Sequence, residues 1–180
     1  HVAVRNALRA AAAAAGILGR NAPALWSEVA EGLFIQGPDS AGVIPEYTGY
    51  NGHAIKQADV ILAFFPLDHR LPPAQIQANL DYYHDRVLCG PLMTETVEAA
   101  LRLRLGRADK MVVLAELLRA YRRCVHGAFE VPYETAWNSN SLMLTACGGL
   151  LSTLACGWWA YRQPGDDASL IPRLACGPTR

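Results

Sequence analysis

The residues with the clearest potential for chemistry lie where a long polar loop meets an apolar segment. Lys56 and Gln57 stand side by side at that point, and Glu46, Tyr47 and Tyr50 precede them in the loop. Together they offer a cation, an amide, a carboxylate and flat aromatic faces. Sugars need this combination, because their hydroxyl groups donate and accept hydrogen bonds while their C–H faces pack on aromatic rings. The alternatives are a solvated surface lysine, tyrosines that pack within the loop, and a Glu46 that bonds the loop backbone.

A second long loop carries another carboxylate, Glu134, and an aromatic residue, Trp137. A carboxylate placed over a sugar site can activate water as a general base. Trp137 can line the same site. A solvent-exposed loop acid and a tryptophan used only for packing are the corresponding structural alternatives.

Helical spacing of apolar residues runs through most of the chain, with Gly and Pro at the breaks. The pattern predicts helices over residues 2–15, 22–33, 55–65, 73–87, 92–105, 108–125 and 141–161, with Asn21 as the cap of the second. Alternation with period two is too short to predict a strand before residue 165. The chain is therefore predicted to be all-α.

The connections between these helices are alternately short and long. The long ones are residues 36–54, called the first loop, and residues 127–140, called the second loop. Loops of this length in compact domains are usually functional. In a chain of up-down helix pairs every second connection lies at the same end, so both loops and the link at 89–91 are expected to share one face. The residues then expected near helix N-termini, where backbone N–H groups are free, are Lys56, Gln57, Thr94 and Asn140.

The helix pairs also limit the architecture. Their spacing follows no fixed period, which argues against a repeat solenoid. Unequal pairs with long loops at one end favour an α/α toroid.

Residues 142–161 carry no charge and are long enough to cross a bilayer. Glycines such as Gly148 and Gly149 interrupt them, so we predict a buried helix whose glycines allow close backbone approach, with a membrane helix as the alternative.

Composition restricts the partners and cofactors. The 16 basic and 16 acidic residues cancel, so no net charge attracts a nucleic acid or an anionic membrane. The five cysteines and five histidines lack the spacing of a zinc site or a disulfide framework. We expect neither a metal nor another cofactor. The chain begins at His1 without Met or a signal peptide, which predicts a piece of a longer protein.

Five stretches stand out in order along the chain: IPEYTGYNGHAIKQADVILAFFPL, NLDYY, GPLMT, FEVPYE and LTACGGLLSTLACGWWAYR. Together they resemble glycoside hydrolase family 65, especially its hydrolases of α-glucosides, and KQADV is the most specific element. The resemblance covers residues 1–162 and implies the later part of an (α/α)6 barrel. It also implies that residues 163–180 form the linker to, or the start of, a C-terminal β-sandwich region.

The resemblance implies a role for each candidate residue. Lys56 and Gln57 match the pair that holds the glucose ring in this family, and Glu134 matches the general base of its inverting hydrolases. Glu46 and Trp137 are further substrate-binding candidates. The general acid would precede His1, so the 180 residues are expected to need the rest of their own chain for turnover of a sugar substrate.

Two other functions stay open. Phosphorylases of the same family bind phosphate at the position of VLCGPLMTE, where this chain offers the hydroxyl groups of Thr94 and Thr96. The other alternative is a non-catalytic helical module that binds carbohydrate or associates with a membrane.

Overall fold

The computed structural model describes residues 1–87, 91–137 and 142–158. The elements in chain order are α1 (Val2–Ile17), α2 (Ala24–Gly32), α3 (Asp59–Phe64), α4 (Pro73–His84), α5 (Leu92–Leu105), α6 (Lys110–Cys124), β1 (Val125–His126), β2 (Val131–Pro132), α7 (Leu144–Ser152) and the π-helix η1 (Thr153–Trp158). Helices thus dominate the described residues, and the all-α prediction is confirmed. The arrangement is that of a partial helical barrel.

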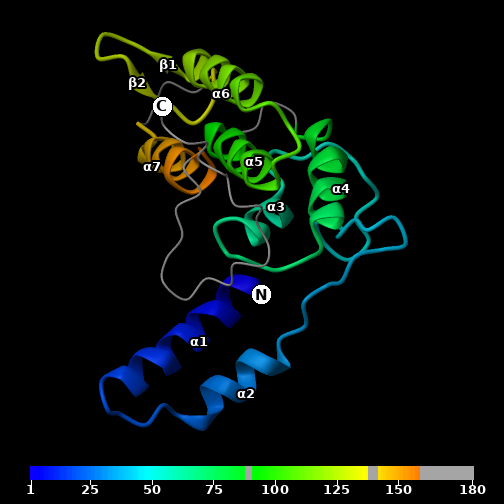
Figure 1. Cartoon of the computed structure of the whole chain (residues 1–180), viewed down its shortest axis with the longest axis vertical. Helices are drawn as coiled ribbons and strands as arrows, with labels where there is room; N and C mark the ends of the chain where they lie inside the picture. Colours follow the sequence, from blue (N-terminus) through cyan, green and yellow to red (C-terminus); the bar gives the residue numbers. More distant parts are fainter. Residues whose placement is uncertain (88–90, 138–141, 159–180) are drawn as a thin grey trace, which may run out of the picture.

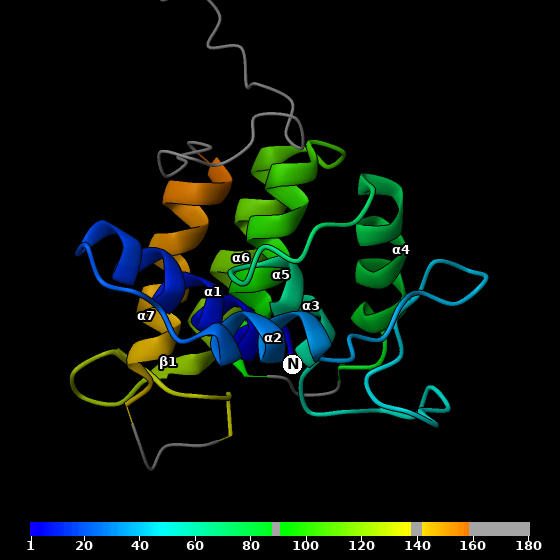
Figure 2. The same ribbon diagram turned by 90° about the horizontal axis from the view of Figure 1, so that it is seen from below.

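α5 lies at the centre of the larger part of the molecule (Figure 1), with α6 and α7 on one side and α3 and α4 on the other. Figure 2 shows α4, α5 and α7 standing side by side. Local signals explain the α5–α6 hairpin: Gly106 ends α5 in the left-handed conformation, with φ of 65°, as is common at helix C-termini. The Asp109 side chain then accepts hydrogen bonds from Met111 N and Val112 N and caps α6.

The contact between α5 and α7–η1 depends on glycine. A Cβ on Gly149 would lie 2.2 Å from Thr96 Oγ1, and a Cβ on Gly157 would lie 3.1 Å from Ala100 Cα. The Thr153 hydroxyl donates to the Thr96 carbonyl across the same contact at 2.7 Å. The predicted close approach to another backbone is confirmed at Gly157, whereas Gly149 faces the side chain of Thr96. The prediction is wrong for Gly148, where an added Cβ would meet nothing within 4 Å.

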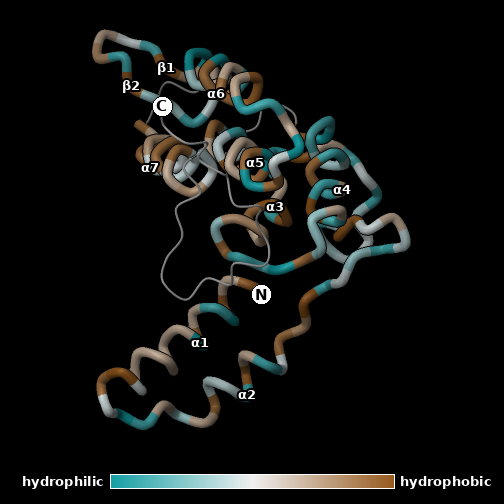
Figure 3. The backbone as a smooth tube through the Cα atoms, in the orientation of Figure 1, coloured by the Kyte–Doolittle hydropathy of each residue, from teal (hydrophilic) through white to brown (hydrophobic). Residues whose placement is uncertain are grey.

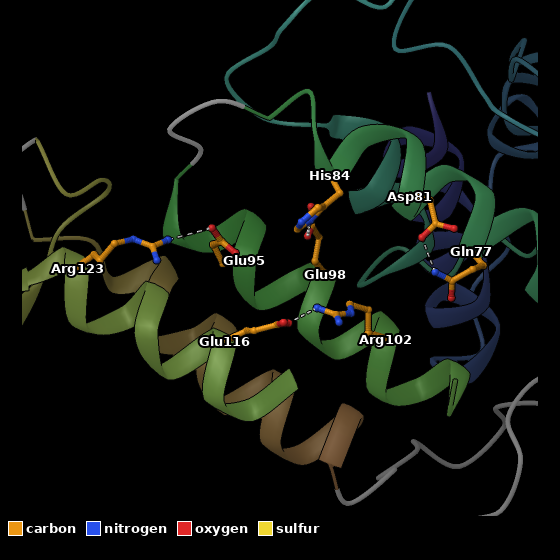
Figure 4. A network of polar contacts seen from close by, with 8 residues as sticks. All are labelled: Gln77, Asp81, His84, Glu95, Glu98, Arg102, Glu116 and Arg123. Atoms are coloured by element: carbon orange, nitrogen blue, oxygen red, sulfur yellow. Dashed lines mark hydrogen bonds and ion pairs between the residues drawn. The ribbon is translucent and has the colours of Figure 1, made fainter. Parts of the chain in front are cut away.

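The main core lies where α3, α4 and α5 meet and includes Ile61, Phe64, Leu80, Tyr83 and Leu101. Figure 3 shows hydrophobic and hydrophilic residues alternating along α4, α5 and α6, as expected for helices buried on one side. Ion pairs join neighbouring helices of this layer (Figure 4). These pairs are His84–Glu98, Arg102–Glu116 and Arg123–Glu95.

α1 and α2 form a separate hairpin that stands away from α3–α7 (Figure 1). Val2 is the buried residue of α1, and Ala30 that of α2. Asn6 donates to the Leu67 carbonyl at 2.5 Å and so joins α1 to the segment after α3. The predicted Asn21 cap is wrong, because α2 begins after Pro23 and has no side-chain cap.

Two predicted helix boundaries are wrong for tertiary reasons. α3 begins at Asp59 rather than Ile55, because Ile55 instead forms a parallel bridge with Val87. The same bridge takes Val87 out of α4, which ends at His84. Lys56 and Gln57 therefore precede the helix and do not lie in its first turn.

The last helix also differs from its prediction. It begins at Leu144 and changes to a π-helix at Thr153. Leu144 and Leu151 are 71% and 68% exposed, so α7 is covered on its α5 side and open on the other within the described residues. No helix among those residues has the length and hydropathy needed to span a membrane.

A strand pair was not predicted. β1 and β2 are antiparallel, with Val125 opposite Pro132 and His126 opposite Val131. Two-residue strands are too short to leave a period in the sequence. The expected C-terminal β region at residues 163–180 lies outside the described residues, as does Asn140.

Candidate functional site

α4 holds the first loop in place through two buried polar side chains. Asn79 Oδ1 accepts a hydrogen bond from Ile44 N at 2.9 Å, and Asn79 Nδ2 donates to the Gly42 carbonyl at 2.9 Å. The Tyr83 hydroxyl donates to the Ile44 carbonyl at 2.6 Å. Both side chains are fully buried. Burial raises the pKa of Tyr83, so its hydroxyl stays protonated and keeps donating.

Glu46 connects this loop to α3. Its Oε1 accepts from Asp59 N at 2.8 Å, and its Oε2 accepts from Val60 N at 3.4 Å. The carboxylate thus satisfies backbone N–H groups at the start of the helix. Burial raises the pKa of Glu46, although these two backbone hydrogen bonds oppose the change. Glu46 therefore has a structural role, but it binds the backbone at the start of α3 and not the loop backbone that was considered. Its contact with a sugar stays a prediction.

Lys56 and Gln57 lie in the short segment between the first loop and α3. Its start is held in place by Ile55 N, which donates to the Arg86 carbonyl at 2.9 Å. Lys56 is exposed and Gln57 is half-buried. Gln57 Nε2 donates to Asp59 Oδ1 at 2.7 Å.

Two aromatic rings of the first loop lie in contact with each other. Tyr47 and Tyr50 meet edge to face, with ring centroids 5.5 Å apart. Tyr50 also stacks against Tyr83 of α4, at 6.1 Å. Tyr47 is 49% exposed, and its hydroxyl is 3.2 Å from His53 Nε2. The loop thus keeps part of an aromatic face available to solvent beside Glu46.

Backbone contacts hold the second loop. Tyr133 N donates to the Cys124 carbonyl at 2.9 Å, and Leu92 N at the start of α5 donates to the Glu134 carbonyl at 2.8 Å. The Tyr133 ring stacks on His126, with centroids 4.3 Å apart. The backbone of Glu134 is therefore tied to both the strand pair and α5.

The segment that follows the first loop meets the second loop at an ion pair. Lys56 Nζ is 2.5 Å from Glu134 Oε1, although 78 residues separate them. The lysine side chain is 61% exposed and the glutamate side chain 29%, so solvent and small ligands can reach the pair. With the Ile55–Val87 bridge and the Leu92–Glu134 hydrogen bond, this contact confirms that both loop ends and the start of α5 share one face.

The remaining candidate residues are Trp137, Thr94 and Thr96. Trp137 is 82% exposed, so its ring is not used for packing among the described residues. Of the threonines offered for phosphate, Thr94 is buried, and the Thr96 hydroxyl donates to the Met93 carbonyl at 2.7 Å. Thr96 instead forms part of the α5–α7 contact. Within the described part of the chain, no three His, Cys, Asp or Glu side chains are grouped as a metal site would require.

A cavity of about 560 Å³ opens beside the site. The first loop and α3 line it with Glu46, Tyr47 and Asp59, and the α1 end of the molecule contributes Val2 and Phe34. The described lining does not include the Lys56–Glu134 pair.

Three residues that shape the site were not predicted to do so. Asp59 belongs to the KQADV motif but was not assigned a role. Asn79 and Tyr83 lie on the apolar face of α4, where a polar residue within a buried stripe is the signal that could have singled out Asn79. Their loop partners are distant in sequence and could not be predicted from spacing.

The fold and this site define a class: an all-α domain of helical hairpins with polar loops gathered at one end, as in an α/α barrel. Residues 47–119 match the model of the glycosyl hydrolase family 65 central catalytic domain. The chain belongs to glycoside hydrolase family 65.

Curated relatives match over most of the chain. A kojibiose hydrolase from Mucilaginibacter mallensis is 34% identical over 161 residues, which are 88% of this chain and 23% of the relative. A protein-glucosylgalactosylhydroxylysine glucosidase from Dictyostelium discoideum is 32% identical, over 86% of this chain and 22% of the relative. A periplasmic acid trehalase from Saccharomyces cerevisiae is 30% identical, over 83% and 14%. The chain thus spans less than a quarter of the length of these relatives, all of which are named as glycoside hydrolases.

Proposed function

We propose that this chain is the C-terminal part of the catalytic barrel of an inverting glycoside hydrolase that cleaves an α-glucosidic bond in a disaccharide or glycan. Residues 1–162 form the barrel part, and residues 163–180 lead to a C-terminal β region. The partner is the rest of the same polypeptide, which supplies the other barrel helices and the general acid. Family membership and the names of the relatives support this assignment.

The observation that carries the proposal is the contact between Lys56 and Glu134. A glucose-binding residue and a general base must face the same sugar ring. These two side chains come from the segment before α3 and from the second loop, and they meet at 2.5 Å. Gln57 lies beside Lys56 and supplies an amide to the ring hydroxyls. Glu46 and Trp137 contribute the edge of the sugar site, Trp137 through its exposed ring.

In this reaction Glu134 takes a proton from a water molecule while the water oxygen bonds to the anomeric carbon. The glycosidic C–O bond breaks, and the general acid protonates the departing oxygen. Lys56 holds Glu134 Oε1, so Oε2 is the oxygen that receives the proton. The two carboxyl groups would be separated by roughly 6.5–9.5 Å, which leaves space for the water molecule.

The test is Glu134→Gln in the full-length enzyme, with Glu130→Gln as the matched control. Glu130 is an exposed acid four residues earlier in the same loop. Glu134→Gln should lower kcat by about 10³-fold or more while the affinity for glucose changes little, because the amide cannot accept the proton. Glu130→Gln should leave both unchanged. Near-normal kcat in Glu134→Gln would contradict the assignment of the base.

Two further measurements separate the alternatives. The isolated chain of residues 1–180 should show no turnover, since it lacks the acid, and measurable hydrolysis by it would contradict that part of the proposal. In the full-length enzyme, product formation should be independent of inorganic phosphate. Glucose 1-phosphate among the products would instead identify a phosphorylase.

A further inference from the structure

Asp59 is a carboxylate beside the site whose role the proposed function does not explain. It is exposed, begins α3 and lines the cavity. Its Oδ1 accepts a hydrogen bond from Gln57 Nε2 at 2.7 Å. This contact determines how Gln57 can meet a ligand.

The reason is the asymmetry of the two groups. An ionised carboxylate only accepts hydrogen bonds, whereas an amide has a donor end and an acceptor end. Asp59 therefore binds the NH₂ group of Gln57, and Gln57 Oε1 points away from Asp59. Gln57 in this orientation presents a carbonyl oxygen, which binds the hydrogen of a hydroxyl group.

Asp59 is itself held in position. Its backbone N–H donates to Glu46 Oε1 at 2.8 Å, and Val60 N donates to the other oxygen of Glu46. Glu46 lies in the loop that Asn79 and Tyr83 anchor to α4. The orientation of the Gln57 amide thus follows from buried contacts of α4, through Glu46 and Asp59.

We propose that Asp59 is a positioning residue that fixes the Gln57 amide so that Gln57 Oε1 accepts a hydrogen bond from one hydroxyl group of glucose. The proposal rests on the proposed function, in which Gln57 binds the sugar. It adds a rule of recognition: at this position the ligand must donate a hydrogen bond. A group of similar size that cannot donate, such as fluorine, is rejected there.

The chain contains a matched control for this arrangement. On α4, Gln77 Nε2 donates to Asp81 Oδ1 at 2.8 Å, and Figure 4 shows the pair near the His84–Glu98 ion pair. Gln77 is half-buried and Asp81 exposed, as are Gln57 and Asp59. Removal of Asp81 therefore reproduces the loss of a Gln–Asp hydrogen bond away from the site.

The test is calorimetric titration of the full-length enzyme with glucose and with its 2-, 3-, 4- and 6-deoxyfluoro analogues. In the wild type, one fluorine substitution should weaken binding about tenfold, since Gln57 Oε1 loses its donor. In Asp59→Ala that penalty should fall below about threefold, because the freed amide can turn and offer its NH₂ group to fluorine. Asp81→Ala should retain the wild-type pattern.

Asp59→Asn supplies the conservative variant. Its side-chain oxygen can still accept from Gln57 Nε2, so the fluorine penalty should return at least in part, and thermal unfolding of each variant confirms that it folds. Gln57→Ala distinguishes sugar binding by Gln57 from the positioning role of Asp59. If Gln57→Ala binds glucose as well as the wild type, both the assignment of Gln57 and this proposal are wrong. If Gln57→Ala weakens binding but Asp59→Ala keeps the full fluorine penalty, the proposed function stands and the role of Asp59 is overturned.

Discussion

The first and second loops meet at one site but are held by different kinds of contact. The first loop is fixed by side chains that are fully buried in α4, Asn79 and Tyr83, which bind its backbone. The second loop is fixed through its own backbone, by the strand pair and by the hydrogen bond from Leu92 N to the Glu134 carbonyl. Its Phe129 and Trp137 side chains remain in solvent, 88% and 82% exposed.

This difference matches the tasks that we propose for the loops. Sugar recognition needs several donors and acceptors in fixed positions, and a loop anchored by buried hydrogen bonds provides them. The general base needs one carboxylate at one place, which a short backbone ladder and a lysine can supply. Substitutions behind the first loop should therefore have larger effects than substitutions in the second.

Asn79→Ala should have the largest effect on stability. It removes the partners of Ile44 N and of the Gly42 carbonyl and leaves buried polar groups unpaired, which costs about 3 kcal/mol. Native-state hydrogen exchange in the full-length enzyme should show this loss as easier opening of the first loop. Asn51→Ala, in the exposed part of the same loop, is the control and should change little. Equal protection of the first loop in Asn79→Ala and in the wild type would show that Asn79 does not hold this loop in place.

Tyr83→Phe should have a smaller effect of the same kind. The ring stays in the core, and only the hydrogen bond from the hydroxyl to the Ile44 carbonyl is lost, at a cost of about 1–1.5 kcal/mol. Tyr82→Phe is the neighbouring control, because the Tyr82 ring mainly packs under the Arg86 guanidinium. Exchange in the second loop should be the same in both variants. A larger change in the second loop than in the first would contradict the division between them.

The pH should also act on the first loop through α4. His84 of α4 is 3.2 Å from Glu98 of α5. The hydrogen bond to Glu98 raises the pKa of His84, and burial raises the pKa of Glu98. Both groups bind protons more tightly in the folded state, so their protonation contributes to the free energy of unfolding in acid. This contribution is lost as the pH rises from the ordinary pKa of glutamate, 4.5, to above the ordinary pKa of histidine, 6.5.

Hydrogen exchange checks this expectation, after correction for the intrinsic rate at each pH. Protection of the first loop should fall more steeply than that of the second between pH 5 and pH 8, and His84→Gln should flatten the dependence. A steeper change in the second loop would show that the α4–α5 contact does not support the first loop in this way.

The smallest effects on stability are expected for the exposed aromatic residues of the second loop. Phe129→Ala and Trp137→Ala remove rings that are 88% and 82% exposed, and each should change the free energy of unfolding by less than about 0.5 kcal/mol. They should differ in binding, since we propose Trp137 but not Phe129 as part of the sugar site. Equal affinity of both variants for the substrate would remove Trp137 from that site.

Some of this structure could be predicted from local signals. The bounds of α5 were predicted to the residue, because Pro91 precedes the helix and Gly106 ends it. The common face of the two loops followed from the alternation of helix pairs, and the contact between Lys56 and Glu134 is its direct result. The close approach at Gly149 and Gly157 followed from glycines in an apolar helix.

Other features depend on partners that are distant in sequence. The start of α3 is set by Glu46, whose carboxylate binds the N–H groups of Asp59 and Val60. The strand pair is too short for a periodic pattern, and the turn at residues 127–130 sets its register. The exposed side of α7 could not be predicted either, because apolar composition alone does not say how much of a helix is covered.

The central claim is that both loops act on one glucose ring. A crystal structure of the full-length Glu134→Gln variant with an uncleaved α-glucoside tests it most directly. The account predicts that Lys56 and Gln57 lie within hydrogen-bonding distance of the ring, about 3 Å, and that the anomeric carbon faces residue 134 across one water molecule. A glucoside bound elsewhere, with Lys56 and Gln57 free of the sugar, would contradict it.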